Sequence, residues 1–291
     1  MINNDINCNK RTPEDVALLM TDLAFAPVSD EITDGEYSIY DGTCGSGELI
    51  SAAYQKLCTL TEKTGRTISA HFYGQEQDSE LYALCKTAFL PNEENINISF
   101  GSALSNDSNA ESKFDFMISC PPRGKSWKAD YDKMSVRGRI GDERFIDNTE
   151  TVKPQSMIPG KRDGQLLYLL NNVSKMKDSP LGSRIVEVHS GSLLFSGKAG
   201  SAESNARRYL IKRDLIEAII ALPKNLFRDT AVPLFILVLS NRKEERRKGK
   251  IQLINASAMK APLPKNAGRK NCILDEKNRA EIMRLYSDME E

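Results

Sequence analysis

The sequence predicts an α/β protein built on one mostly parallel, doubly wound sheet. Short apolar runs typical of buried strands alternate with longer runs whose apolar residues recur at helical spacing. Glycine, aspartate or proline follows several of the predicted strands, at the sheet edge where such folds bind ligands. A chain of 291 residues with 40% hydrophobic residues can bury one sizeable core. We therefore expect one domain over residues 1–260, followed by a tail over 261–291 with a short helix.

The first half of the chain alternates regularly between helix and strand patterns. A helix is expected over 12–26, because Thr12 and Pro13 mark a start and apolar residues then recur at helical spacing. The other expected elements are a strand at 37–40, helices at 48–60 and 79–89, and strands at 71–73, 96–100 and 114–119.

Residues 123–163 have no sustained period and are rich in Gly, Lys, Arg and Asp. This pattern predicts a long functional loop or a mobile insertion, and plain disorder is the alternative.

Regular structure resumes after residue 163. The expected elements are helices at 165–176 and 206–212, a Gly/Ser-rich loop at 196–204, strands at 184–189, 215–222 and 234–239, and an edge strand at 250–254. Beyond Pro262 we expect a polar tail until a helix at about 275–289, which either packs on the domain or leads into a continuation.

Composition and charge exclude several classes of protein. The 40 basic and 40 acidic residues cancel, so the total charge does not indicate a nucleic-acid binder, and any DNA contact must be local. The six cysteines form no CxxC pair and predict no metal site, which suits a reducing cytoplasm. No signal peptide or membrane span is apparent, so we expect a soluble intracellular protein.

The strongest local motif is YSIYDGTCGSGELISAA, a strand followed by a glycine-rich turn and a helix. Glycines allow the backbone to approach a ligand closely, and the helix start leaves amide donors free. The spacing matches neither the dinucleotide nor the phosphate-loop pattern, which disfavours NAD and ATP. A tight turn without a ligand remains the alternative. The turn residues are Asp41, Gly42, Cys44, Gly45, Ser46 and Gly47.

Two further motifs follow predicted strands. Glu76 in FYGQEQD stands where an acid in nucleoside-binding folds accepts hydrogen bonds from ribose hydroxyls. FDFMISCPPRGKSW places Cys120-Pro121-Pro122-Arg123 directly after an apolar strand, at the sheet edge that carries chemistry, although a proline pair can also simply end a strand.

Together these motifs resemble the N6-adenine DNA methyltransferase family, specifically the modification subunit of type I restriction-modification systems. The resemblance runs from about Thr12 to Ser257 and includes GQLLYLLNNVSKMK, RIVEVHSGSLLF and RRYLIKRDLIEAIIALPKNLFRDTAVPLFILVLS in the family's order. It implies a Rossmann-like, mostly parallel seven-stranded sheet with helices on both faces and a closing antiparallel hairpin. It also implies in-line methyl transfer from S-adenosylmethionine to adenine N6 in DNA.

The resemblance assigns roles to individual residues. It gives cofactor contacts to Thr12, Pro13, the turn residues Asp41 to Gly47, Glu76 and Ser102, and catalysis to Cys120, Pro121, Pro122 and Arg123.

The chain departs from the family at three of these places. The family has Asn-Pro-Pro followed by an aromatic residue where this chain has Cys120-Pro121-Pro122-Arg123. Gly42 replaces a proline, and Ser102 replaces an aspartate. Since cysteine is a poor hydrogen-bond acceptor, these changes leave two functions open: an active enzyme, or an impaired subunit that only binds the cofactor or assembles. A nicotinamide oxidoreductase and a cysteine nucleophile of the cytosine-C5 type are disfavoured by the surrounding residues.

The family also implies protein partners, since no target-recognition domain or helical N-terminal domain is apparent here. A specificity subunit would then read the DNA sequence, and a restriction subunit would complete the complex. A basic cluster between residues 242 and 250 is either a solvated loop or, with Arg207-Arg208, a phosphate-contacting patch. The cluster comprises Arg242, Lys243, Arg246, Arg247, Lys248 and Lys250.

Overall fold

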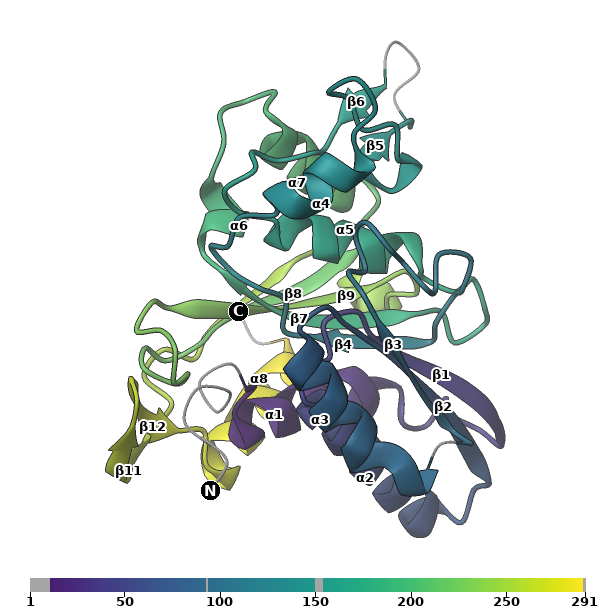
Figure 1. Cartoon of the computed structure of the whole chain (residues 1–291). Helices are drawn as coiled ribbons and strands as arrows, with labels where there is room; N and C mark the ends of the chain where they lie inside the picture. The colour runs from purple at the N-terminus through teal and green to yellow at the C-terminus, as the bar shows by residue number, and fades with distance from the viewer. Residues whose placement is uncertain (1–10, 93, 150–153, 290–291) are drawn as a thin grey trace.

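A mixed eight-stranded sheet crosses the centre of the computed structural model, which describes residues 11–92, 94–149 and 154–289 (Figure 1). Its strands are β1 (Gly35–Asp41), β2 (Ile68–Glu76), β3 (Ile96–Phe100), β4 (Phe116–Ser119), β7 (Arg184–Ser190), β8 (Ile216–Ala221), β9 (Leu234–Ser240) and β10 (Gln252–Asn255). The order across the sheet is β10-β8-β9-β7-β4-β1-β2-β3. Only β9 runs antiparallel to its neighbours, β7 and β8.

The predicted fold class is confirmed, with one correction to the strand number. The family pattern implied seven strands, whereas the sheet has eight. The additional strand is β10, which pairs in parallel with β8 from Gln252 to Asn255 and occupies the sheet edge. It is the edge strand that the apolar pattern indicated at 250–254.

Helices cover both faces of the sheet because successive strand residues point to opposite sides. Ile39 of β1 lies in one core, with α1 (Glu14–Phe25), α2 (Glu48–Thr64), α3 (Ser79–Phe89) and α8 (Glu276–Asp288). The next residue, Tyr40, lies in the other core, with α5 (Gln165–Ser174), α6 (Ser192–Phe195) and α7 (Ala202–Lys212). Figure 1 shows these two sets of helices on opposite sides of the sheet. Within the described ranges, none of the helices has the length and apolar character needed to cross a bilayer.

The described part of 123–163 is a folded insertion and not a disordered loop. It contains α4 (Lys128–Met134), a 3₁₀ turn at Glu143–Phe145 and the short antiparallel pair β5 (Ile146–Asp147) and β6 (Gln155–Ser156). Its aromatic side chains Trp127 and Phe145 are buried in the second core. Hydrogen bonds from Arg144 to the carbonyls of Ala103 and Leu104, at 2.9 and 2.7 Å, tie it to the loop after β3. This order was not visible in the sequence because the elements are too short to show a period.

The segment beyond residue 260 contains more structure than expected. A hairpin of β11 (Ala261–Ala267) and β12 (Lys270–Ile273) precedes α8. Its prolines and charged residues hide the strand alternation, which explains why it was not predicted. Helix α8 packs on the sheet, since the hydroxyl of Tyr286 lies 2.8 Å from Nη2 of Arg184. A domain boundary near residue 260 stays a prediction.

Candidate functional site

The carboxyl ends of β1, β2, β3 and β4 meet at a cavity of about 440 Å³. This volume lies within the range of small-molecule sites, and the location is the one expected for an open α/β sheet. Many of the predicted site residues line this cavity: Gly42, Gly45, Glu76, Ser102, Cys120, Pro121, Pro122 and Arg123.

The glycine turn and Glu76 are joined directly. The N–H of Gly45 donates to Oε2 of Glu76 at 2.9 Å, and the N–H of Asp78 donates to Oε1 at 2.8 Å. Burial raises the pKa of Glu76, and these backbone hydrogen bonds oppose the shift. Since the two carboxylate oxygens together can accept about four hydrogen bonds, Glu76, which lines the cavity, retains acceptor capacity.

Gly47 has a structural reason to be glycine. It precedes α2 with φ of +92°, and a Cβ there would lie 2.5 Å from the ring of Phe89. The turn can therefore reach its conformation and pack against α3 only with glycine at this position.

Two predicted cofactor residues lie beneath the cavity surface. Asp41 is 2% exposed, its Oδ1 accepts from the N–H of Thr43, and its Oδ2 has no hydrogen-bond partner. Burial raises the pKa of Asp41 to about 8. The side chain of Cys44 packs in the first core, with its Sγ 3.9 Å from that of Cys85. We therefore assign Cys44 no side-chain contact with a ligand.

Four other predicted residues surround a neighbouring cavity of about 580 Å³: Thr12, Pro13, Ser46 and Gly47. Arg11 lines both cavities, and its Nε lies 3.3 Å from Oε1 of Glu48 at the start of α2. The structure thus divides the expected cofactor residues between two adjacent hollows.

The Cys-Pro-Pro-Arg motif forms one wall of the first cavity. Cys120 is half-buried, and Nη1 of Arg123 donates to its Sγ at 2.9 Å and to the carbonyl of Pro121 at 3.3 Å. Burial alone would lower the pKa of Arg123, but its interactions with Cys120 and with the carboxylate of Asp229 outweigh burial and raise the pKa. Arg123 therefore places a permanent positive charge on this wall.

Sequence analysis missed residues that the fold brings to the cavity from other segments. Trp127 lies in the insertion, Tyr168 on α5, and Phe227 and Asp229 in the loop between β8 and β9. The guanidinium of Arg123 stacks 5.1 Å from the ring centroid of Phe227. Of these residues, only Phe227 could have been proposed from the sequence, because it lies shortly after a predicted strand. The order of the strands in the sheet cannot be read from a local pattern.

The cavity suits a nucleoside cofactor that carries a charged amino-acid part. The remaining lone pairs of Glu76 are acceptors for hydroxyl donors. Beneath the same turn, the buried Oδ2 of Asp41 has no hydrogen-bond partner. Gly101, which has φ of +135°, lies at the same edge, and a Cβ there would lie 2.6 Å from Nδ2 of Asn106. This set of groups fits S-adenosylmethionine.

Three of the basic groups considered for phosphate contact have partners within the protein. Lys243 lies 2.6 Å from Asp214, and Arg247 is 2% exposed and donates to Gln252 at 3.1 Å. Arg207 donates to the carbonyl of Leu193 at 3.0 Å. These three groups stabilise the fold, whereas Arg242, Arg246 and Lys248 have side chains that are 51–58% exposed, so a phosphate-contacting patch stays a prediction for the exposed part of the cluster.

Comparison with known proteins identifies relatives along nearly the whole chain. The family model described as N-6 DNA Methylase matches residues 9–291. The methylase subunit of type I restriction enzyme MjaVII from Methanocaldococcus jannaschii is 29% identical over 96% of this chain and 44% of its own length. The MpnII methylase subunit from Mycoplasma pneumoniae is 30% identical over 81% of this chain and 40% of its own. The chain thus spans less than half the length of these relatives.

A solved structure confirms the fold. The methyltransferase subunit of a type I restriction-modification system from Streptococcus thermophilus aligns with a TM-score of 0.75 and 24% identity. The alignment covers 97% of this chain and 54% of that one. The resemblance to modification subunits that the motifs indicated is confirmed, and so is S-adenosylmethionine as the cofactor that goes with this family.

Proposed function

We infer that this chain, which belongs to the N-6 DNA methylase family, transfers a methyl group from S-adenosylmethionine to the exocyclic amine of adenine in DNA. The observation that carries this proposal is a single cavity that joins two kinds of group. Glu76 and the Gly45 turn form its nucleoside end, and the Pro121 carbonyl and Cys120 form its opposite wall.

The residues act by positioning and not by covalent chemistry. S-adenosylmethionine, when bound, supplies an electrophilic methyl group. Glu76 fixes the ribose, Asp41 supports the glycine turn through Thr43, and the carbonyl of Pro121 accepts a hydrogen bond from the target amine. Holding the amine in line with the methyl group supplies most of the acceleration in such a transfer.

Cys120 and Arg123 lower the expected rate. A thiol accepts a hydrogen bond weakly, so the amine keeps one strong acceptor, the Pro121 carbonyl. Loss of one well-placed polar partner in a reacting centre costs about 3 kcal/mol, roughly a hundredfold in rate. We therefore propose slow turnover.

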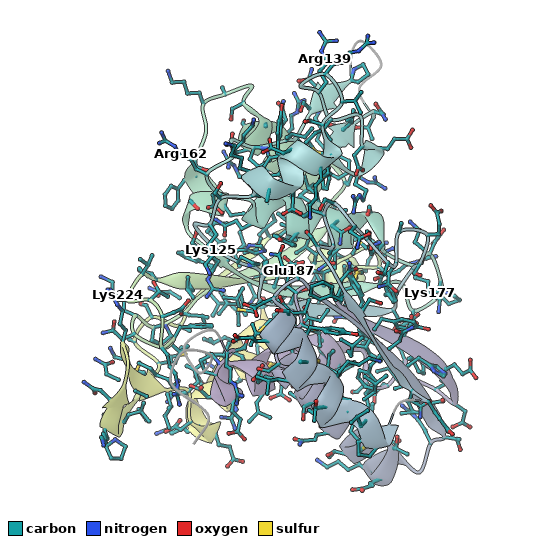
Figure 2. All side chains as sticks on the ribbon, viewed as in Figure 1. Lys125, Arg139, Arg162, Lys177, Glu187 and Lys224 are labelled. Atoms are coloured by element: carbon teal, nitrogen blue, oxygen red, sulfur yellow. The ribbon has the colours of Figure 1, made fainter. Side chains whose placement is uncertain are left out.

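DNA is the proposed substrate, and exposed basic side chains near the cavity support it. Lys125 lines the cavity, and Figure 2 shows it with Arg162 and Lys224 along one side of the molecule. Lys177 lies on the other side, and Glu187 lies inside. Reversing the charge of Lys125 and Arg162 together should weaken DNA binding and reduce its salt dependence. Lys177→Gln, which avoids a second carboxylate beside the buried Asp115, should change neither.

The partners are also part of this proposal. We propose that a specificity subunit reads the target sequence and that a restriction subunit joins the same complex. Both would act in the cytoplasm, where the DNA is. The relatives that suggest this are subunits of type I restriction enzymes.

The deciding experiment measures N6-methyladenine formed on unmethylated genomic DNA from S-adenosylmethionine. The parent protein is compared with the double variant Cys120→Asn/Arg123→Phe, and Glu76→Ala in each background is the control. We expect the double variant to methylate at least tenfold faster. An active parent with an inert double variant would refute the assignment of Cys120 and Arg123. An absence of cofactor-dependent methylation in all forms, assayed together with the specificity subunit, would refute the proposed activity.

A further inference from the structure

Arg123 fills the part of the cavity that should receive the substrate. Its Nη1 donates to Cys120 Sγ at 2.9 Å and to the Pro121 carbonyl at 3.3 Å, so one amino group uses both acceptors of this wall. Its side chain is 13% exposed and lies against the ring of Phe227. A planar, amino-bearing group is thus already bound there, and it belongs to the protein itself.

The surroundings of this guanidinium form a complete recognition set for a flat amine. Two acceptors meet the amino group, an aromatic ring covers the plane, and Asp229 stands 3.7 Å from Nη2 at the rim. An exocyclic amine on an aromatic base has the same shape and the same donors as one edge of guanidinium. A base and Arg123 therefore compete for one position.

We propose that Arg123 is a displaceable internal surrogate for the target amine, which occupies the base position until a base displaces it. This inference rests on the proposed function for the identity of the base. The displaced guanidinium has a partner outside, because Asp229 is 45% exposed and already within ion-pair distance. Arg123 is a gating residue and not a catalytic one.

Occupation of the base position by Arg123, which we call the gate, should lower the affinity for a base. If a ligand binds only after the guanidinium leaves, its apparent affinity equals its intrinsic affinity multiplied by the fraction of molecules in which Arg123 is displaced. A charge-assisted hydrogen bond and a stacking contact together favour the closed form by roughly tenfold or more. Removing the guanidinium should therefore tighten binding of a base by a factor on the order of ten.

Alkylation of Cys120 measures the gate without any methyl transfer. Wild type, Arg123→Ala and the cavity-lining control Lys125→Ala are treated with iodoacetamide, and mass spectrometry follows Cys120 against the exposed Cys58. We expect methylguanidinium to protect Cys120 in Arg123→Ala and to have no effect in wild type or Lys125→Ala. If methylguanidinium accelerates alkylation, Arg123 activates the thiol and does not cover it, and the proposal is overturned. Equal protection in all three proteins, or protection in none, also overturns it.

A second probe tests the base itself. S-adenosylhomocysteine is added at saturation to fill the nucleoside end, and 9-methyladenine is then titrated with Cys120 alkylation as the readout. We expect half-protection of Arg123→Ala at a concentration roughly tenfold lower than for wild type. Weaker protection of the variant would mean that Arg123 helps to bind the base, which overturns the proposal. That result would not contradict the proposed methyl transfer, which is tested separately by the assay for N6-methyladenine.

Discussion

The N–H of Gly45 and the carboxylate of Glu76 are joined by a 2.9 Å hydrogen bond that ties the turn after β1 to the end of β2. The glycine turn and the carboxylate of Glu76 are therefore held together before any ligand arrives. A binding site that is already ordered loses less conformational entropy on binding.

Replacing Glu76 should weaken cofactor binding and also lower stability, because the N–H groups of Gly45 and Asp78 lose their acceptor. Hydrogen bonds to a charged group are worth about 1.5–3 kcal/mol, so Glu76→Ala should weaken S-adenosylmethionine binding by roughly 10- to 100-fold. Glu76→Gln should be intermediate, since it keeps one acceptor oxygen. Isothermal titration calorimetry measures the dissociation constants, with the exposed α2 variant Glu62→Ala as the control. An unchanged constant in Glu76→Ala would exclude the ribose assignment.

Asp41 should make stability depend on pH. Its pKa is raised to about 8 by burial, so the folded state holds a proton that the unfolded chain releases above about pH 4. The stabilisation is complete below about pH 4 and is lost as pH rises through about 8. Between pH 5 and 8 the free energy of unfolding should fall by roughly 3–4 kcal/mol relative to Asp41→Asn, which does not titrate.

Urea denaturation of both proteins at pH 5, 6.5 and 8 measures this difference. The amide of the Asp41→Asn variant keeps an oxygen that can accept from the N–H of Thr43, so the comparison isolates the proton. Parallel stability curves for the two proteins would show that Asp41 does not titrate in this range.

Arg144 should control the order of the insertion. Besides the carbonyls of Ala103 and Leu104, it contacts Asn171 at 2.7 Å and Asp107 at 3.1 Å. Arg144→Met keeps much of the volume but removes every donor, and we expect a loss of roughly 2–3 kcal/mol. Hydrogen exchange should then rise both in the insertion and in the loop after β3. The exposed Arg139→Met is the matched control, and equal exchange in the two variants would contradict this role.

The pair Arg184 and Glu217 should be sensitive to removal of one partner. The two side chains are 3% and 2% exposed and lie 2.9 Å apart. Burial by itself raises the pKa of Glu217, but the charge of Arg184 reverses the shift and lowers it. Glu217→Gln leaves a buried cation without its counter-ion and should cost about 3–5 kcal/mol.

The double variant Arg184→Met/Glu217→Leu tests whether charge is the cause. It should recover much of that loss, because an apolar pair of similar volume replaces an ion pair at little cost. Denaturant midpoints of the single and double variants give the comparison. A double variant less stable than Glu217→Gln would show that the geometry of Tyr286 and Arg184 matters more than the charge balance.

The sequence was informative where structure and chemistry are local. The turn from Asp41 to Gly47, Glu76 and the Cys120–Arg123 motif each lie next to a strand whose apolar run is visible, so their common edge follows from parallel topology. Side-chain direction was not accessible in the same way. Cys44 belongs to the glycine motif, but its thiol points into the core.

The rest of the site depends on contacts between distant segments. Phe227 and Asp229 reach the cavity because β9 inserts between β7 and β8, an arrangement that no local pattern encodes. The basic residues show the converse: Lys243 and Arg247 have the composition of a surface patch, and yet both are buried with internal partners. Charge in a sequence does not reveal whether the fold provides a counter-ion.

Trp127, the sole tryptophan of the chain, is 3% exposed and lines the cavity together with Cys120 and Arg123. Its indole donates to the carbonyl of Gly160 at 3.1 Å and meets the ring of Tyr131 edge-on. The protein therefore has an intrinsic fluorophore in the wall of the cavity proposed to hold the cofactor and the base. Changes in its emission can time each arrival separately in a stopped-flow instrument, with no label attached to protein or DNA.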